Sequence, residues 1–162
     1  MIETIVIILL VALDQLVKHL VRIHIPLDGQ VPFIPHVLAL AHIHNTGAAF
    51  SMLSGARWFF VALTVAFVVF ALRVLYAKKI IHPFGRWTLS LIIAGAVGNL
   101  IDRALCGYVV DMFEVLFMRF AIFNVADIFV VVGGILFCVY YGFLHDKFNA
   151  KEKRVEHHDD PL

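Results

Sequence analysis

Four long apolar stretches constrain the fold of this chain more than any other feature of its sequence. They cover residues 2–23, 58–77, 87–106 and 122–144, and a helix needs roughly 20 apolar residues to cross the hydrocarbon core of a bilayer. Apolar residues make up 62% of the 162 residues and charged residues only 15%. Because a water-soluble domain of this size cannot bury so much apolar surface, we expect an all-α integral membrane protein, a bundle of four transmembrane helices.

The distribution of lysine and arginine predicts how this bundle is oriented. Eight of these residues flank the connection between the second and third stretches or lie in the C-terminal tail, and five lie on the opposite side. The positive-inside rule then places both termini in the cytoplasm. We expect one domain over residues 1–145 and a charged cytoplasmic tail over 146–162, with the loops 24–57 and 107–121 on the outer face.

The loop 24–57 is long enough to form structure outside the membrane. Its apolar residues between Val31 and Ile43 are spaced by two or four, which is a weak strand signal, and Asn45-Thr46-Gly47 is typical of a turn. His42 and His44 alternate in this segment, but no cysteine or carboxylate stands near them at ligand spacing. We therefore expect no metal site there.

Two ionisable residues, Asp14 and Lys18, interrupt the first apolar stretch. Together with the absence of a basic leader, they favour a retained span over a cleaved signal peptide. At positions i and i+4 they face the same side of a helix and can pair. Two interpretations stay open: a self-neutralised pair with Lys18 extending outward to the interface, or a brace that supports an active site through hydrogen bonds.

The third stretch carries Asn99, Asp102 and Arg103 on one helix face, at positions i, i+3 and i+4. Gly95 and Gly98 in the same stretch allow another helix to approach closely. The three polar residues are consistent with a packing seam that contains an internal Asp102–Arg103 pair. They are equally consistent with the polar wall of a substrate site.

Asp111 and Asp127 form the most informative pair of ionisable residues. Asp111 lies just beyond the third stretch, and Asp127 is expected one to two turns inside the fourth, so both should lie near the outer membrane surface. They are 16 residues apart, and neither has a basic residue within four positions. Two carboxylates held close together share a proton, which supplies a general base for water and a general acid for a carbonyl oxygen. This pattern predicts hydrolysis by the two aspartates.

Three alternatives compete with this interpretation. Asp102 could replace Asp111 in the pair with Asp127, although Arg103 next to it and Asn99 one turn before it favour a fixed, ionised brace. A small proton- or ion-coupled transporter would also contain embedded carboxylates, but it should carry polar residues through the full depth of the membrane. In a structural membrane protein, the same polar residues would only join helices.

Along nearly its whole length, the chain resembles the lipoprotein signal peptidases, or signal peptidase II, of bacterial inner membranes. Each matching block is short, and the order of the blocks on a four-span scaffold makes the resemblance specific. The blocks are Asp14-Gln15-Leu16-Val17-Lys18, Asn45-Thr46-Gly47-Ala48-Ala49-Phe50-Ser51, Gly98-Asn99-Leu100-Ile101-Asp102-Arg103 with Val109-Val110-Asp111, and Phe123-Asn124-Val125-Ala126-Asp127.

The resemblance implies an aspartic endopeptidase without a cofactor, whose catalytic residues are Asp111 and Asp127. Its substrates would be prolipoproteins that carry diacylglycerol on the lipobox cysteine, and it would remove the signal peptide by cleaving before that cysteine. The enzyme would work near the outer face of the bacterial cell (inner) membrane, in contact with membrane lipid and not with nucleic acid.

The resemblance also implies roles for the remaining residues of the matching blocks. It implies a small extracytoplasmic β-cradle built from the outer loops and a flap-like helix in the loop 24–57. His44 departs from the residue found before this asparagine in many relatives. The implied substrate-binding residues are Asn45, Asn99, Arg103 and Asn124, and the implied supporting residues are Asp14, Lys18, Gly47, Asp102 and Ala126.

Overall fold

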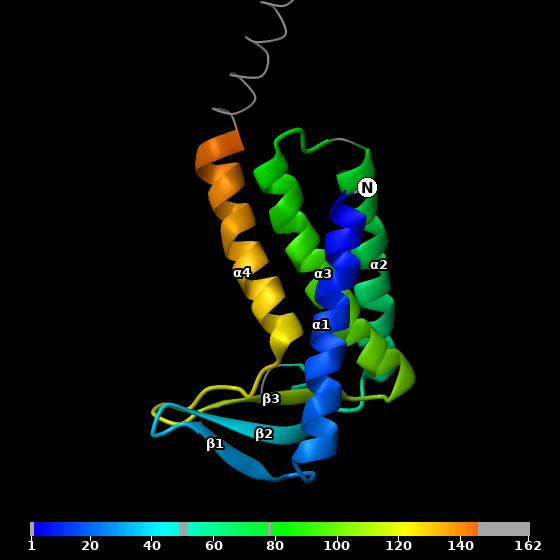
Figure 1. The fold of residues 1–162 in the computed structure, drawn as a ribbon. Coiled ribbons are helices and arrows are strands. Elements are labelled where there is room, and N and C mark those ends of the chain that lie inside the picture. The colour runs from blue at the N-terminus through cyan, green and yellow to red at the C-terminus, as the bar shows by residue number, and fades with distance from the viewer. Residues whose placement is uncertain (1, 49–51, 78, 146–162) are drawn as a thin grey trace, which may run out of the picture.

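A computed structural model describes residues 2–48, 52–77 and 79–145 of the chain. Within these residues, four helices are long and apolar enough to cross a membrane, and they run side by side in one bundle (Figure 1). The predicted four-helix membrane architecture is therefore confirmed. The helices are α1 (Ile2–His24), α2 (Arg57–Tyr76), α3 (Pro83–Leu105) and α4 (Val125–Val139), the last continued by the short π-helix η2 (Tyr140–Leu144).

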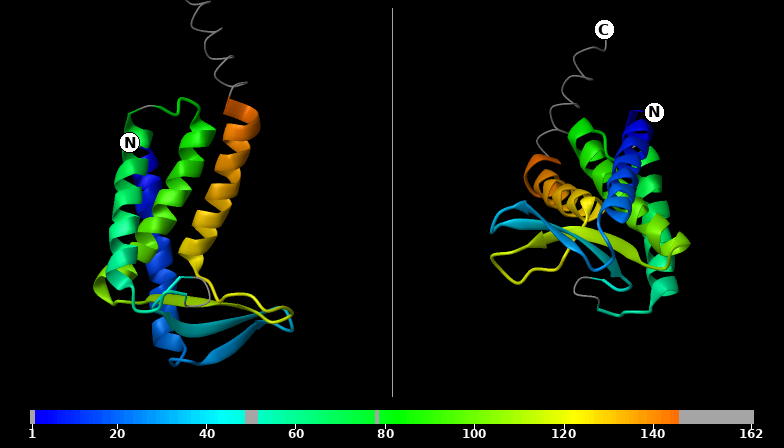
Figure 2. Two further views of the ribbon diagram at one scale, coloured as in Figure 1. Left: turned by 180° about the vertical axis from the view of Figure 1, so that it is seen from behind. Right: turned by 60° about the horizontal axis from the view of Figure 1, so that its bottom comes forward.

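A three-stranded antiparallel sheet lies across one end of the bundle. Its strands are β1 (Gln30–Ile34), β2 (Leu38–Asn45) and β3 (Val109–Val115), in the order β1-β2-β3. The small sheet expected from the loops is thus present. Residue 2 and residue 145 both lie at the opposite end of the bundle, as the views of Figures 1 and 2 agree.

Helix α3 is the centre of the bundle and packs against α1, α2 and α4. The close approach predicted at its glycines is confirmed. A Cβ atom on Gly98 would lie 2.6 Å from Oδ2 of Asp14, and a Cβ on Gly95 would collide with the backbone oxygen of Ala126. Because glycine has no side-chain carbon, α1 and α4 can approach the backbone of α3 closely at these two positions.

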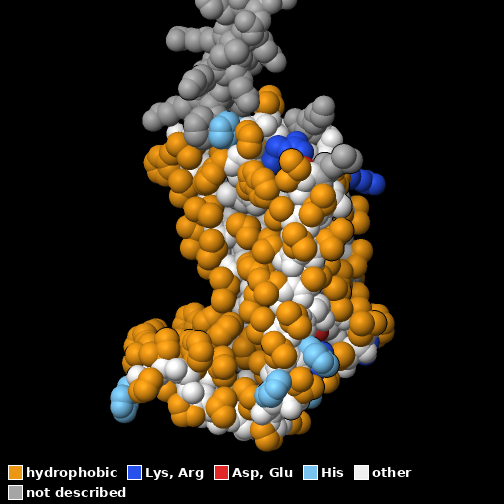
Figure 3. All heavy atoms as spheres, in the orientation of Figure 1, with side chains coloured by type: hydrophobic (Ala, Val, Ile, Leu, Met, Phe, Trp, Pro, Cys, Tyr) orange, Lys and Arg blue, Asp and Glu red, His pale blue; other side chains and the backbone are white. Residues whose placement is uncertain are grey.

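Apolar side chains cover most of the outside of the bundle, and two charged side chains lie fully within it. Leu9, Phe70 and Ile135 on three different helices are each at least 60% exposed, and Figure 3 shows hydrophobic side chains over most of the visible helix surface. Asp14 and Lys18 are instead fully buried. A surface of this kind is suited to lipid rather than water. Apolar side chains form no hydrogen bonds, so none is left unsatisfied when they contact hydrocarbon.

Two expectations fall wholly or partly outside the described residues. The flap-like helix would lie between β2 and α2, where the described residues 46–48 and 52–56 form bends and turns and residues 49–51 are outside the described chain. The predicted tail over 146–162 also lies outside it.

Candidate active site

The two aspartates come from different kinds of structure. Asp111 lies on β3, opposite Ile43 of β2, and is 3% exposed. Asp127 is the third residue of α4. We expected Asp127 one to two turns inside a span that began near residue 122. The helix begins later because Asn124 has an extended backbone and caps it, and helices begin where a side chain accepts from their free N–H groups.

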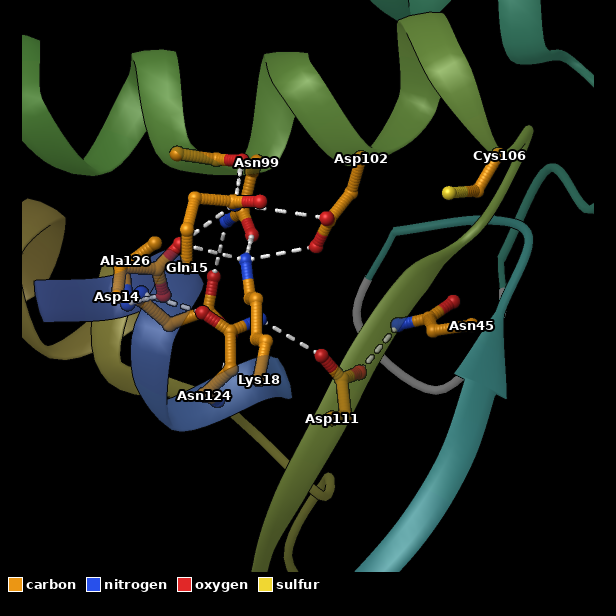
Figure 4. A network of polar contacts seen from close by, with 12 residues as sticks. Asp14, Gln15, Lys18, Asn45, Asn99, Asp102, Cys106, Asp111, Asn124 and Ala126 are labelled. Atoms are coloured by element: carbon orange, nitrogen blue, oxygen red, sulfur yellow. Dashed lines mark hydrogen bonds and ion pairs between the residues drawn. The ribbon is translucent and has the colours of Figure 1, made fainter. Parts of the chain in front are cut away.

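Asn124 connects these two aspartates, and Figure 4 shows its contact with Asp111. Its Nδ2 donates to Oδ1 of Asp111 at 2.7 Å, and its Oδ1 accepts from the backbone N–H of Asp127 at 3.1 Å. The backbone N–H of Asn124 in turn donates to Oδ2 of Asp127 at 3.1 Å, which completes a capping box. The same side chain therefore starts α4 and fixes the position of both carboxylates.

Two further asparagines donate hydrogen bonds to the remaining side-chain oxygens of Asp111 and Asp127. Nδ2 of Asn45 donates to Oδ2 of Asp111 at 2.8 Å, and Nδ2 of Asn99 donates to Oδ1 of Asp127 at 2.8 Å. Each of the four carboxylate oxygens thus accepts one hydrogen bond. The structure brings all three asparagines that the sequence singled out to the two aspartates.

Opposing influences act on the ionisation of Asp111. Together they raise the pKa of its carboxyl group from 3.8 to about 6: burial raises the pKa most, the donors Asn124 and Asn45 lower it, and the nearby Asp127 raises it. Burial has the largest effect because removing a carboxylate from water disfavours its charged form. Asp111 can therefore hold a proton at a pH where an exposed aspartate has lost it.

Arg103 and Asp102 point in different directions from α3. An amino group of Arg103 (Nη2) donates to the backbone oxygen of Gly47 at 2.9 Å, and the guanidinium lies over the ring of Phe60 at 5.2 Å. Asp102 instead pairs with Lys18 at 2.9 Å. The interpretation of an internal Asp102–Arg103 pair is wrong, because consecutive residues on a helix do not face each other.

Lys18 is the centre of a buried ionic cluster between α1 and α3. Its Nζ lies 2.9 Å from Oδ2 of Asp14 and 2.9 Å from Oδ2 of Asp102, and it donates to Oδ1 of Asn99 at 3.0 Å. The predicted Asp14–Lys18 pair is present. Extension of Lys18 to the interface is wrong, because two carboxylates compensate its charge inside the protein, as a buried ion requires.

The cluster reaches the aspartate pair along two routes. Lys18 holds the oxygen of Asn99, so the amide nitrogen of Asn99 must face Asp127. On the second route, Oδ1 of Asp14 accepts from the backbone N–H of Ala126 at 2.9 Å, within the first turn of α4. Both routes fix the position of Asp127.

Two members of this cluster had no role assigned from the sequence. Nε2 of Gln15 donates to the backbone oxygen of Gly98 at 3.1 Å and to Asp14 at 3.2 Å. Arg22 pairs with Asp102 at 3.2 Å. The signal for Arg22 was its position, because Asp14, Lys18 and Arg22 recur every four residues on one face of α1.

A cavity of about 610 Å³ opens in front of the aspartates. Its apolar wall is formed by α4 and by the segment 120–123 that precedes it, with Phe60 of α2 opposite. Among its lining residues on α4, Val131 is 57% exposed, so the cavity reaches the lipid-facing side of the helix. Its polar lining consists of Asn45, Asn99, Arg103, Asp111, Asn124 and Asp127.

His42 and His44 lie on β2 and do not line the cavity. Nδ1 of His42 is 2.8 Å from the backbone oxygen of Ile25, and the ring of His44 stacks on Tyr108 at a centroid distance of 3.6 Å. No group of three or more histidine, cysteine or acidic residues in the described part of the chain could hold a metal ion. The polar side chains that line the cavity carry carboxyl groups, amides and one guanidinium.

The fold and the site define a multi-pass membrane protein with one buried and one half-buried carboxylate, Asp111 and Asp127, at one end of its bundle. A family model described as "Signal peptidase (SPase) II" matches residues 6–143. A lipoprotein signal peptidase of Streptococcus pyogenes serotype M2 is 46% identical over 132 residues, which cover 82% of this chain and 87% of the relative. One from Clostridioides difficile is 42% identical over 147 residues, covering 91% and 99%. The chain belongs to the signal peptidase II family and is a protease.

A solved structure supports the same assignment. It is described as a bacterial membrane enzyme and superposes with a TM-score of 0.81 at 31% identity, covering 91% of this chain and 90% of that one. A second structure with the same description gives a TM-score of 0.78, also at 31% identity, and covers 89% and 93%. The transporter alternative finds no support in any of these matches.

Proposed function

We propose that this protein is an aspartic endopeptidase that removes signal peptides from diacylglyceryl-modified prolipoproteins by cleaving before the lipidated lipobox cysteine. The observation that carries the proposal is the pair of aspartates joined by Asn124 at the polar end of an apolar cavity. The named relatives are lipoprotein signal peptidases, which agrees with this choice of substrate.

In the proposed reaction, Asp111 and Asp127 share one proton as a coupled pair. The ionised carboxylate takes a proton from water, and the hydroxide attacks the carbonyl carbon of the scissile peptide bond. The protonated carboxyl group donates its proton to the carbonyl oxygen, giving a tetrahedral diol. Collapse of the diol breaks the C–N bond, and a proton passes to the leaving amine. The pair ends with the proton count it began with.

The walls of the cavity suit a peptide that leaves the membrane at this point. The signal peptide is an apolar helix, and the apolar residues of α4 and the segment 120–123 can contact it. Its backbone must unwind for cleavage, and the freed N–H and C=O groups need hydrogen-bond partners in a site beside the hydrocarbon of the membrane. Arg103 lines this cavity, and we propose that its guanidinium donates to a substrate carbonyl.

We further propose that the cavity lies near the outer face of the membrane and that both termini are cytoplasmic, with residues 1–145 as a single peptidase domain. The sheet, which carries Asp111, and the first turn of α4, which carries Asp127, lie at the end of the bundle opposite residues 2 and 145 (Figure 1). The excess of lysine and arginine near those ends favours the cytoplasm for them. The sheet would then be extracytoplasmic, where a lipid-anchored substrate meets it by diffusion in two dimensions.

The proposal is tested with purified protein and one prolipoprotein in two forms, with and without the diacylglyceryl group. Mass spectrometry should show loss of the signal peptide from the lipidated form only, with the modified cysteine as the new N-terminus. A prolipoprotein with serine in place of that cysteine serves as the control and should stay intact. Cleavage at another bond, or no cleavage of the lipidated form, would contradict the proposed function.

A further inference from the structure

An apolar arm extends sideways from the helix bundle. It consists of residues 31–37, which form the outer strand and the turn after it, and residues 116–120, which follow β3. The two parts are joined by a backbone hydrogen bond of 3.0 Å from Leu116 to Val37. Figure 1 shows that the strands run across the helix axes, so the arm extends to the side of the bundle and not along it.

The side chains of this arm are large, apolar and open to the surroundings. Their exposed fractions range from 42% for Val31 to 68% for Phe117. Isolated apolar side chains are common on protein surfaces, whereas a contiguous set marks a contact with a partner or a membrane. The exposed apolar residues of the arm are Val31, Phe33, Ile34, Val37, Leu116, Phe117, Met118 and Phe120.

The depth of the sheet indicates which partner covers the arm. The sheet does not lie beyond the end of α1 but packs against its last part. There Val21 of α1 and Ile25, the residue that follows the helix, form one buried cluster with Val110 and Met112 of β3. Helix α1 is itself long and apolar enough to span a membrane. The sheet therefore lies at the depth of the boundary between hydrocarbon and headgroups.

The arm also continues the lipid-facing surface of the bundle. Phe120 lines the same cavity as Val131 of α4, which is 57% exposed on the outside of the helix. Figure 3 shows hydrophobic side chains over both the helices and the projecting part of the sheet, with a hollow between them. An apolar surface that begins on a membrane helix and continues along the arm is most simply covered by the same lipid.

The one cationic residue of the arm fits this environment. Arg119 is exposed between Met118 and Phe120, and it forms no ion pair with a carboxylate of the described residues. Long basic side chains at an interface keep their stem in apolar surroundings and extend their charge to the lipid phosphates. Aromatic rings such as Phe117 prefer the same layer of the membrane.

We propose that the apolar arm is a second membrane contact, which inserts its side chains into the interface of the leaflet next to the sheet. The four helices anchor the protein, and the arm fixes the height of the sheet on which Asp111 lies. The partner is the bilayer itself, not a second protein. This inference rests on the exposed arm and the membrane helices and is independent of the reaction proposed above.

The experiment places a fluorescent label on the arm of the full chain in phosphatidylcholine vesicles. Cys106 and Cys138, both exposed free thiols, are replaced by serine, and Phe117→Cys or Met118→Cys then carries an environment-sensitive fluorophore. Two reference labels set the scale: Ile135→Cys on the outside of α4 and Lys79→Cys in the exposed connection between α2 and α3, with iodide on both faces of the vesicles. Each label is quenched separately by spin-labelled lipid, with the spin near the headgroup, and by aqueous iodide.

We expect spin-labelled lipid to quench the labels at 117 and 118 at least several-fold more than the label at Lys79→Cys, and iodide to quench them several-fold less. The depth should be shallower than that of the label at Ile135→Cys. Labels that iodide reaches as readily as the reference at position 79 would overturn the proposal, since the arm would then lie in water. Labels shielded from both quenchers would overturn it as well, because a protein would then cover the arm.

Discussion

The side-chain amide of Asn124 donates a 2.7 Å hydrogen bond to Asp111, and its oxygen caps the helix that carries Asp127. The start of α4 and the geometry of the two carboxylates therefore depend on the same side chain. A site of this kind is fixed before substrate arrives, because the cap is part of the folded helix. Preorganised groups of this sort account for much of the rate enhancement of enzymes.

Asn124→Ala should reduce kcat roughly 100-fold, the usual effect of losing one preorganised donor. It should also lower the free energy of unfolding by about 1 kcal/mol through loss of the cap. Because the donated hydrogen bond lowers the pKa of Asp111, its removal raises that pKa, and the acidic limb of the pH–activity profile should move to higher pH. Steady-state cleavage across pH measures both effects.

Asn124→Ser is the matched control for this variant. Serine caps helices about as well as asparagine, but its shorter side chain carries no amide donor for Asp111. Stability should return with serine while the shifted pH profile remains. A profile that returns to the wild-type position would show that the cap alone sets the ionisation of the pair.

The stability of the protein should fall as the pH rises from about 4 to 6. The pKa of Asp111 is raised from 3.8 to about 6 in the folded state, so in this window the folded protein holds a proton that the unfolded chain has lost. Stability then decreases with pH, by on the order of 3 kcal/mol from this one group. Below this window both states are protonated, and above it both are ionised.

Thermal unfolding of the wild type and Asp111→Asn in the same detergent isolates this contribution. Because asparagine does not titrate, the difference between the two unfolding temperatures should move in favour of Asp111→Asn as the pH rises from 4 to 7. A difference that stays constant over this range would show that ionisation of Asp111 costs the fold nothing.

Lys18→Met should destabilise the protein by about 3–5 kcal/mol, because it leaves two buried carboxylates, Asp14 and Asp102, without their shared cation. Adding Asp14→Asn removes one of these charges, and Arg22 still pairs with Asp102. The double variant should therefore recover much of the unfolding temperature. Its cleavage rate should stay low, since nothing then holds the oxygen of Asn99 away from Asp127. Recovery of both quantities together would contradict a positioning role for Lys18.

Gly98→Ala should disturb the site from a distance. The added Cβ would lie 2.6 Å from Oδ2 of Asp14, so Asp14 must move away from Ala126 and Lys18, and both the unfolding temperature and the cleavage rate should fall. Gly134→Ala on α4 is the control, because a Cβ there meets nothing within 4 Å. In a helix interior that change should be neutral or stabilising by up to about 1 kcal/mol. Equal effects of the two substitutions would contradict the close packing of α1 on α3.

Much of this architecture follows from the sequence alone. Apolar length predicts the four helices, and the spacing of Asp14 and Lys18 predicts their pairing, because both depend only on local periodicity. The position of Asp111 on a strand was not predictable in this way. Residues 109–112 of β3 are buried one after another, since α1 packs on one face of the strand, and continuous burial removes the alternation that marks a strand in sequence.

The inward direction of Lys18 was also beyond local reasoning. Whether a lysine extends to the interface or stays inside depends on a partner 84 residues away, Asp102, and that contact exists only once α1 and α3 have packed. For the same reason, Gln15 and Phe60 acquire their contacts with the site through tertiary structure. Sequence periodicity places a residue on a face but does not identify what that face meets.

The central claim is that Asp111 and Asp127 carry out the hydrolysis, and one set of turnover measurements tests it most directly. Purified Asp111→Asn and Asp127→Asn are assayed on lipidated prolipoprotein beside Glu114→Gln, a neighbouring carboxylate on β3, and Asp102→Asn, the rival of Asp111. Both dyad variants should lose signal-peptide cleavage while keeping a folded helix bundle, and Glu114→Gln should retain it. Continued turnover by Asp111→Asn, with loss in Asp102→Asn, would contradict this account and move the reaction to Asp102.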